Sequence, residues 1–148
     1  MNVFGERQNP EKFLIKCIRA TQTGENITIH SSPDRKQSGS RCWIHARNAS
    51  AAVLFLLEKG VIGERYNIVG EERNNSDMAN FIMKVANCKY PFLDFVDFHS
   101  SRPGHDLRYA LDGTKMEDMG WRYPRTLEDS LAKMVQWTLK PENIRWIQ

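Results

Sequence analysis

Apolar residues recur three and four positions apart in several segments of the chain, and this spacing predicts amphipathic helices. The first helix starts at Pro10, with the proline in its first turn, and ends near Gly24. A capping sequence at Thr126–Asp129 predicts the start of the last helix, which stops before Pro141. The other helices are expected over residues 49–59, with Asn48 as N-cap and Gly60 as stop, from residue 75 or 76 to about 86, and over 114–119 before Gly120.

Short segments between these helices predict strands, because they alternate in polarity or are rich in β-branched and aromatic residues. These segments cover residues 26–30, 41–46, 65–69, 92–98 and 108–111. Residues 31–40 are polar and contain a proline, a glycine and four serines, which predicts a loop. Since strands alternate with helices, the pattern predicts an α/β or α+β architecture.

Composition narrows this picture to one globular domain. The 148 residues are 41% hydrophobic and 26% charged, which excludes a disordered or fibrous chain. The net charge of +3 comes without a basic stripe, so nucleic acid is not an expected partner. The N-terminus has no apolar signal-peptide core, and the longest apolar stretch, residues 49–57, is too short to cross a bilayer. We therefore expect no membrane association.

The cysteines point to a reducing compartment. Cys17, Cys42 and Cys88 are odd in number, far apart in the sequence and outside any CxxC pair. This usage favours reduced, buried thiols in a cytoplasmic protein, and the missing ligand spacing argues against a zinc site. No metal-binding residues are predicted.

No self-contained catalytic or cofactor motif is present in the sequence. None of the four histidines lies in a GxSxG elbow or an HExxH motif, and no GxGxxG or Walker A pattern occurs. The densest polar segment is Arg102–Asp106, whose arginine could hold phosphate or carboxylate or could pair with Asp106 in a surface turn. Arg41 could bind an anion or lie extended at a strand end, and Asn67 could bind a ligand or satisfy the backbone.

Taken in order, these segments resemble the C-terminal half of the nucleotide-sugar 4,6-dehydratases of the extended short-chain dehydrogenase/reductase family, and in particular the dTDP-glucose 4,6-dehydratases. Residues 2–5 (NVFG) are similar to the family's NxYG segment, residues 9–13 (NPEKF) to its PEKL segment, residues 41–45 (RCWIH) to RDWLY and residues 66–68 (YNI) to YNIGG. Residues 102–106 (RPGHD) match RPGHD, residues 108–112 (RYALD) resemble RRYAID, and Gly120-Trp121 matches the family's GW.

The resemblance implies a small mixed α/β domain over residues 1–148 that binds a nucleotide diphosphate sugar, dTDP- or UDP-linked, without most of the Rossmann sheet. It implies diphosphate and ribose binding by Arg41, Asn67 and Arg102, with His105 beside them, and a contact of Asn2 with the sugar or diphosphate. It implies that the nucleotide pocket is lined, largely through backbone groups, by Glu11, Lys12 and Phe13. The base would be flanked by Thr28, Ile29 and His30. No catalytic residue is assigned to this chain.

Several departures from the family pattern leave specificity open. Cys42 stands in place of the family's aspartate, His45 in place of its tyrosine, and His30-Ser31 in place of a Tyr-Gly pair. The glycine-rich dinucleotide fingerprint and a YxxxK pair are both absent from the sequence. We therefore expect NAD to bind the missing N-terminal Rossmann half of a longer parent and not this chain.

Three functional hypotheses follow from the sequence. The chain is the nucleotide-sugar-binding portion of an NAD-dependent 4,6-dehydratase or epimerase, a lyase-type fragment that is inactive alone. Alternatively, it is a free-standing binding module without catalysis, or a relict domain that folds only as an oligomer and binds nothing. The expected protein partner is the missing Rossmann half or a second copy of the chain.

Overall fold

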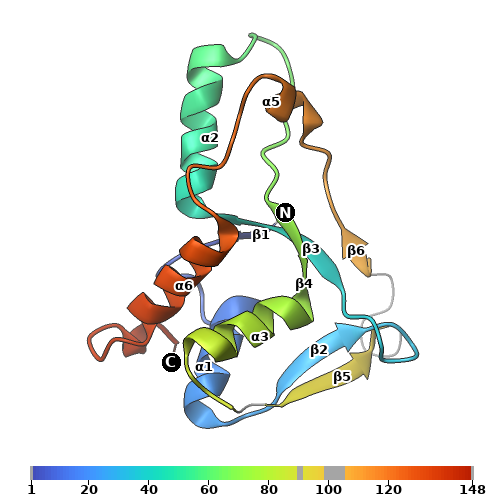
Figure 1. Ribbon diagram of the computed structural model, residues 1–148, viewed down its shortest axis with the longest axis vertical. Coiled ribbons are helices and arrows are strands. Elements are labelled where there is room, and N and C mark those ends of the chain that lie inside the picture. Colours follow the sequence, from blue (N-terminus) through green and yellow to red (C-terminus); the bar gives the residue numbers. More distant parts are fainter. Residues whose placement is uncertain (1, 90–91, 99–105, 148) are drawn as a thin grey trace.

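The computed structural model describes residues 2–89, 92–98 and 106–147 (Figure 1). One sheet is built around β3 (Ser40–His45), which pairs in parallel with β1 (Asn2–Phe4) and β6 (Arg108–Tyr109) and antiparallel with β4 (Glu71–Asn74). A second sheet consists of the parallel pair β2 (Ile27–Ser31) and β5 (Leu93–Asp97). The helices are α1 (Phe13–Thr23), α2 (Ala46–Lys59), α3 (Asn75–Val85), α5 (Thr114–Asp118) and α6 (Leu127–Thr138), with a final 3-10 turn at Ile144–Ile147.

The main hydrophobic core lies where α1, α3 and α6 meet the strands. Ile18, Ile82 and Met134, one from each helix, are fully buried there, and Ile29 of β2 joins them. These residues occupy the apolar stripes that the helical spacing predicts. Figure 1 shows this helical layer beside the β2–β5 pair, while α2 and α5 extend away from it. The α/β class is confirmed.

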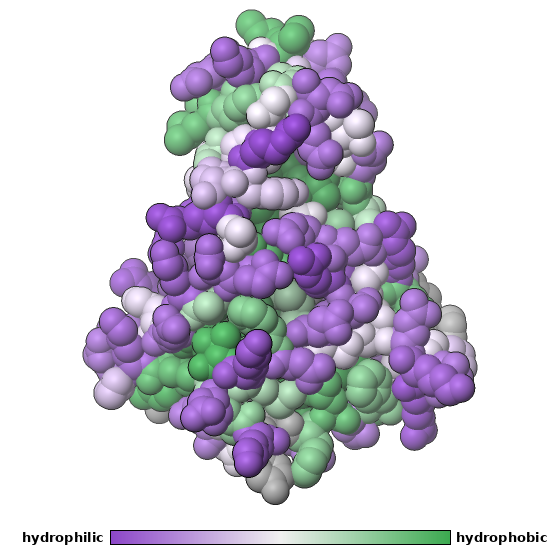
Figure 2. Space-filling view, viewed as in Figure 1, coloured by the Kyte–Doolittle hydropathy of each residue, from purple (hydrophilic) through white to green (hydrophobic). Residues whose placement is uncertain are grey.

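A smaller core holds α2 and α5 together. Ala52 and Met116 are fully buried in it, and Trp121 packs beside the ring of Phe55 with their centroids 5.6 Å apart. Much of α2 is open to solvent in comparison. Its exposed apolar side chains, together with those of the following turn, are Val53, Leu54, Leu57, Val61 and Ile62, and Figure 2 shows apolar surface at this end of the molecule.

The predicted strand over residues 65–69 is wrong. Residues 64–70 have no strand structure, and the strand instead follows them as β4, a segment with the polar sequence EERN. Tyr66 and Ile68 pack against the smaller core, and Asn67 Nδ2 donates to the Asp112 carbonyl at 3.0 Å. A segment forms a strand only when its backbone pairs with a neighbouring strand. The alternation of apolar residues in its sequence does not provide that neighbour.

The predicted cap of α2 is also wrong. The helix starts at Ala46, and the Nδ1 atom of His45 accepts the Arg47 N–H at 3.1 Å, which makes His45 the N-cap. Asn48 lies inside the helix, buried, where its Nδ2 donates to the Arg125 carbonyl. An unprotonated histidine nitrogen accepts a hydrogen bond as the usual capping oxygens do. A residue with a suitable backbone conformation and such an acceptor can therefore cap a helix. Burial lowers the pKa of His45, which favours the neutral ring that can act as an acceptor.

The cysteine prediction is right at two of three positions. Cys17 and Cys42 are buried free thiols, whereas Cys88 is half-buried. Burial raises the pKa of Cys17 to about 12, so this group packs as a small apolar side chain. Among the residues that the structure describes, no helix is both long enough and apolar enough to cross a bilayer.

Candidate functional site

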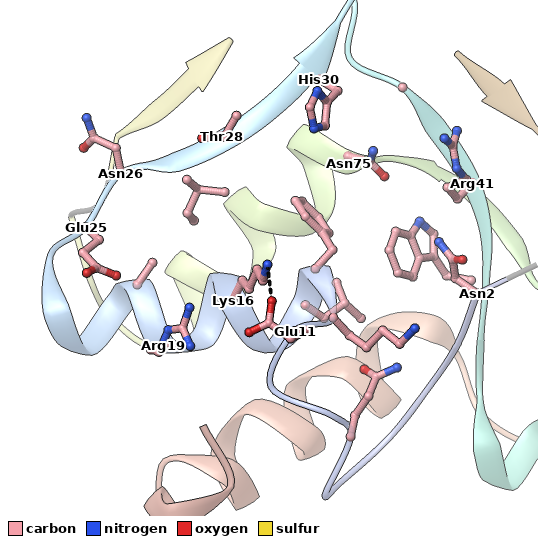
Figure 3. Close-up of a pocket in the computed structure, with 18 of the residues that line it drawn as sticks. Asn2, Glu11, Lys16, Arg19, Glu25, Asn26, Thr28, His30, Arg41 and Asn75 are labelled. Carbon is pink, nitrogen blue, oxygen red and sulfur yellow. Dashed lines mark ion pairs between the residues drawn. The ribbon is translucent and has the colours of Figure 1, made fainter. Parts of the chain in front are cut away.

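A cavity of about 750 Å³ opens between α1 on one side and β2 and β3 on the other (Figure 3). Gln8 and Lys12, from the segment between β1 and α1, also line it, and Asn75 at the start of α3 contributes to its wall. Side chains of β2 alternate across its strand. Ile27 and Ile29 are buried in the core and Thr28 and His30 line the cavity, to whose wall Ile27 also contributes.

Basic side chains outnumber acidic ones in the wall of this cavity. The cationic groups are Lys12, Lys16, Arg19 and Arg41, and the carboxylates are Glu11 and Glu25. Lys16 Nζ pairs with Glu11 at 2.8 Å, and the hydrogen bond from Lys16 lowers the pKa of the Glu11 carboxyl. Within the described ranges, Lys12, Arg19 and Arg41 have no carboxylate at ion-pairing distance. The cavity therefore favours an anionic ligand.

Arg41 is held in place by neutral groups. Its Nη1 donates to the carbonyls of Ser40 at 2.6 Å and Leu107 at 3.1 Å, and its Nη2 donates to the Asp106 carbonyl at 3.0 Å. Carbonyl oxygens orient the guanidinium without neutralising it. Among the described residues these bonds use three of its five N–H groups, and Arg41 lines the cavity.

Aromatic side chains form a rigid part of the wall. Trp43 is buried, its Nε1 donates to the Arg73 carbonyl at 3.3 Å, and its ring lies 6.2 Å from that of Phe13. Phe98 lies at an edge-to-face angle to His30, with the ring centroids 5.7 Å apart. Packed rings of this kind give a flat ligand group apolar surface to lie against.

Known proteins are similar to this chain in sequence and in fold. Residues 1–69 match the NAD dependent epimerase/dehydratase family. The chain is 33% identical to the dTDP-glucose 4,6-dehydratase of Neisseria gonorrhoeae over an alignment that covers 93% of this chain and 42% of that protein. It superposes with a TM-score of 0.79 and 28% identity on the dTDP-glucose 4,6-dehydratase of Bacillus anthracis in complex with NAD, covering 98% of this chain and 44% of that one.

The chain is a partial homologue of the NAD-dependent epimerase/dehydratase family. It spans less than half the length of these relatives. The same fold occurs in the UDP-glucose 4-epimerase of Thermotoga maritima, solved with UDP-glucose, at a TM-score of 0.74 and 22% identity over 94% of this chain and 45% of that one. The resemblance found in the sequence is thus confirmed as a partial match to this family, and the α/β fold with its parallel strand pairs matches part of an extended short-chain dehydrogenase/reductase fold. The assignment to the C-terminal half stays a prediction.

The resemblance to the epimerase/dehydratase family predicted eleven binding residues, and seven of them line one cavity in the structure. These seven are Asn2, Glu11, Lys12, Phe13, Thr28, His30 and Arg41. The side chain of Ile29 does not reach the cavity, because strand alternation turns it into the core. Asn67 lies apart from the cavity, bonded to the Asp112 carbonyl. Arg102 and His105 fall outside the described residues.

Six polar residues of the cavity wall were not predicted from the sequence, namely Gln8, Lys16, Arg19, Glu25, Asn26 and Asn75. Lys16 and Arg19 lie four and seven positions after Lys12, so all three share one side of the first helix. The spacing of these three basic residues in the sequence could have indicated their shared position. Asn75 is different, because the loop at Gly39 brings it to the cavity through a backbone contact: its N–H donates to the Gly39 carbonyl at 2.8 Å. Only the tertiary fold could reveal that approach.

The described residues contain no group of three or more His, Cys, Asp or Glu side chains placed to hold a metal ion. They also lack a closely spaced glycine pair before a helix N-terminus, the arrangement that holds a dinucleotide pyrophosphate. The segment before α1 reads Asn9-Pro10-Glu11-Lys12, and the carboxylate of Glu11 lines the cavity there. The described site does not fit the pyrophosphate of NAD in that mode.

Proposed function

We propose that this chain is the nucleotide-sugar-binding portion of an NAD-dependent 4,6-dehydratase or epimerase. In this proposal residues 1–148 form one binding domain that corresponds to the C-terminal half of the relatives. The observation that carries it is the cavity between α1, β2 and β3, where Arg41 has no ion-pair partner among the described residues and lies beside further cations. The ligand is a nucleoside diphosphate sugar, dTDP- or UDP-linked.

The chemistry of such a ligand suits this wall. A sugar-linked diphosphate carries about two negative charges, and arginine binds phosphate oxygens through its planar set of donors. Lys12 and Arg19 add positive potential from the helix side of the cavity. The diphosphate does not react in a dehydration at the sugar, so its binding energy serves to place the distant sugar carbons.

In this proposal the chain binds the nucleotide sugar, and the additional length of the relatives supplies the chemistry. Oxidation at C4, loss of water across C5–C6 and return of the hydride require NAD and an acid–base pair, which we assign to the additional length of the relatives. In this proposal the chain alone binds the nucleotide sugar and does not turn it over. A free-standing binding module is the alternative, and the exposed apolar side chains of α2 provide a surface for a partner in either case.

Thermal unfolding in the presence of separate ligands tests this proposal. At a concentration one hundred times the Kd, UDP-glucose or dTDP-glucose should raise the Tm by roughly 5 to 10 °C, because ligand binding then adds about 2.7 kcal/mol to the free energy of unfolding. Glucose and NAD at the same concentration should leave the Tm unchanged. Stabilisation by NAD alone would contradict the division of labour, and no response to either nucleotide sugar would contradict the binding role.

A further inference from the structure

The side chain of Arg7 lies over two tryptophan rings near the C-terminal end of the chain. Its guanidinium carbon is 5.7 Å from the ring centroid of Trp137 in α6 and 5.6 Å from that of Trp146 in the final 3-10 turn. A guanidinium within about 6 Å of an indole face is attracted by the negative charge of that face. Within the described ranges Arg7 has no carboxylate at ion-pairing distance, and it does not line the cavity. The two rings are thus the partners that the structure shows for this cation.

The backbone of Arg7 adopts a conformation that costs free energy for residues other than glycine. Its φ angle is 63°, in the left-handed region, where the Cβ of an L-residue crowds a neighbouring carbonyl oxygen. Arg7 belongs to the turn that follows β1. Because a strained residue persists only where its surroundings hold it, the contacts of this side chain bear on the shape of the turn.

The two rings belong to a part of the molecule that the core holds in place. The Trp137 carbonyl accepts a hydrogen bond from Asn143 Nδ2 at 2.9 Å, which ties the end of α6 to the segment before the 3-10 turn. Ile147, next to Trp146, is buried in the main hydrophobic core. Figure 1 shows this end of the chain close to α1 and α6. Arg7 therefore joins the turn after β1 to a fixed support.

The turn that contains Arg7 leads directly into the wall of the cavity. The next residue, Gln8, lines the cavity, and so do Glu11 and Lys12. The Lys12 N–H donates to the Asn9 carbonyl at 3.0 Å, so these residues fold into a compact turn that moves as one piece. A change at Arg7 is thus transmitted to Gln8 and Lys12 through a short stretch of backbone.

Other side chains of the same turn fix it in other directions. Glu6 pairs with Arg47 of α2 at 2.6 Å, and Gln8 Nε2 donates to the Val3 carbonyl of β1 at 2.9 Å. These contacts tie the turn to α2 and to β1. Arg7 adds the tie to α6 and to the C-terminal 3-10 turn.

We propose that Arg7 is a positioning residue for the cavity. Its contacts with Trp137 and Trp146 hold the turn after β1 in the shape that places Gln8 and Lys12 in the cavity wall. Arg7 touches no ligand in this role and acts only through the residues that follow it. The expected effect on nucleotide-sugar binding rests on the proposed function, whereas the effect on the order of the turn needs no ligand.

Exchange of backbone amides with water, measured by NMR on the full chain, tests the inference without a ligand. Asparagine tolerates the left-handed region, so Arg7→Asn removes the guanidinium and keeps the backbone preference. The Lys12 amide should exchange about three- to tenfold faster in this variant, while the amides inside α6 keep their rates and the Tm stays within about 2 °C. Trp146→Leu removes one ring of the contact and should also speed exchange at Lys12. The double variant should exchange no faster there than Arg7→Asn.

Calorimetric titration with UDP-glucose measures the consequence for binding. Arg7→Asn should bind about three- to tenfold more weakly than the wild type, and Arg7→Lys, which returns a cation to the rings, should recover most of the affinity. Arg35→Asn is the matched control, because Arg35 is an exposed arginine with a φ angle of 58° that does not line the cavity. It should leave the affinity and the Lys12 exchange rate within about twofold of the wild type.

Each outcome supports or overturns the inference. Faster exchange at Lys12 together with weaker binding, at a nearly unchanged Tm, supports it. Unchanged exchange in both Arg7→Asn and Trp146→Leu would overturn it, as would a lower Tm with exchange raised equally throughout the chain. Faster exchange with full affinity would remove the role of Arg7 in the cavity. If the wild type does not bind UDP-glucose, the proposed function fails, and the exchange rates still decide whether Arg7 positions the turn.

Discussion

Arg41→Met should weaken binding of UDP-glucose by about 10- to 100-fold. Charge-assisted hydrogen bonds are typically worth about 1.5–3 kcal/mol, and methionine keeps most of the side-chain length while removing the charge and all five donors. Arg41→Lys keeps the charge but loses the planar donor set, so its affinity should lie between those of the wild type and Arg41→Met. Calorimetric titration of the three proteins measures these differences.

A nearby arginine provides the control for this experiment. Arg108 of β6 sits one register position from Arg41 across the sheet, and its Nε and Nη2 each bind a Glu72 carboxylate oxygen at 2.8 Å. It does not line the cavity. Arg108→Met should therefore leave the affinity within about twofold of the wild type, and because this ion pair is exposed to solvent its loss should change the stability little. Equal affinities for wild type, Arg41→Met and Arg41→Lys, all folded, would remove Arg41 from the binding site.

Gly70→Ala should lower the free energy of unfolding by about 3 kcal/mol, near the upper end of overpacking effects. Gly70 precedes β4 and lies directly against the backbone of β3, where an added Cβ would collide with the Trp43 carbonyl oxygen. That carbonyl belongs to a buried central strand and cannot move aside cheaply. Urea denaturation followed by the fluorescence of the tryptophans measures the change.

Gly5→Ala is the matched substitution with room for the methyl group. A Cβ at Gly5 would be 3.5 Å from His45 Nε2 and 3.6 Å from the Ala46 Cβ, which are ordinary contacts. Its effect on the free energy of unfolding should stay below about 1 kcal/mol. If the Gly70→Ala variant is at least as stable as the Gly5→Ala variant, residue 70 does not approach β3 as closely as the structure indicates.

The helices were the most predictable part of the fold, because their apolar spacing records the face that meets the core. Ile18, Ile82 and Met134 are buried where this spacing places them. β4 was not predictable in this way. Its sequence EERN has no apolar face, and it is held by pairing with β3 and by ion pairs such as Arg73 with Glu128 of α6. Pairing partners of this kind are set by the tertiary fold.

The candidate site was predictable where it follows a local motif. Lys12 and Arg41 lie in short segments similar to those of the family, and both line the cavity. Ile29 belongs to such a segment too, yet its side chain turns into the core, since a motif names a stretch of chain and not the face each residue presents. Asn75 has no motif, and only the contact with Gly39 brings it to the cavity.

Titration of the ¹⁵N-labelled chain with UDP-glucose, followed by NMR, tests the central claim most directly. We predict saturable shifts of the backbone amide signals of Lys12, Thr28, Arg41 and Asn75, which surround one cavity. The signals of Val53 on α2 and Lys133 on α6, both outside its wall, should stay unchanged. The absence of saturable shifts at millimolar UDP-glucose, or shifts confined to α2 and α6, would contradict the assignment of this cavity as a nucleotide-sugar site.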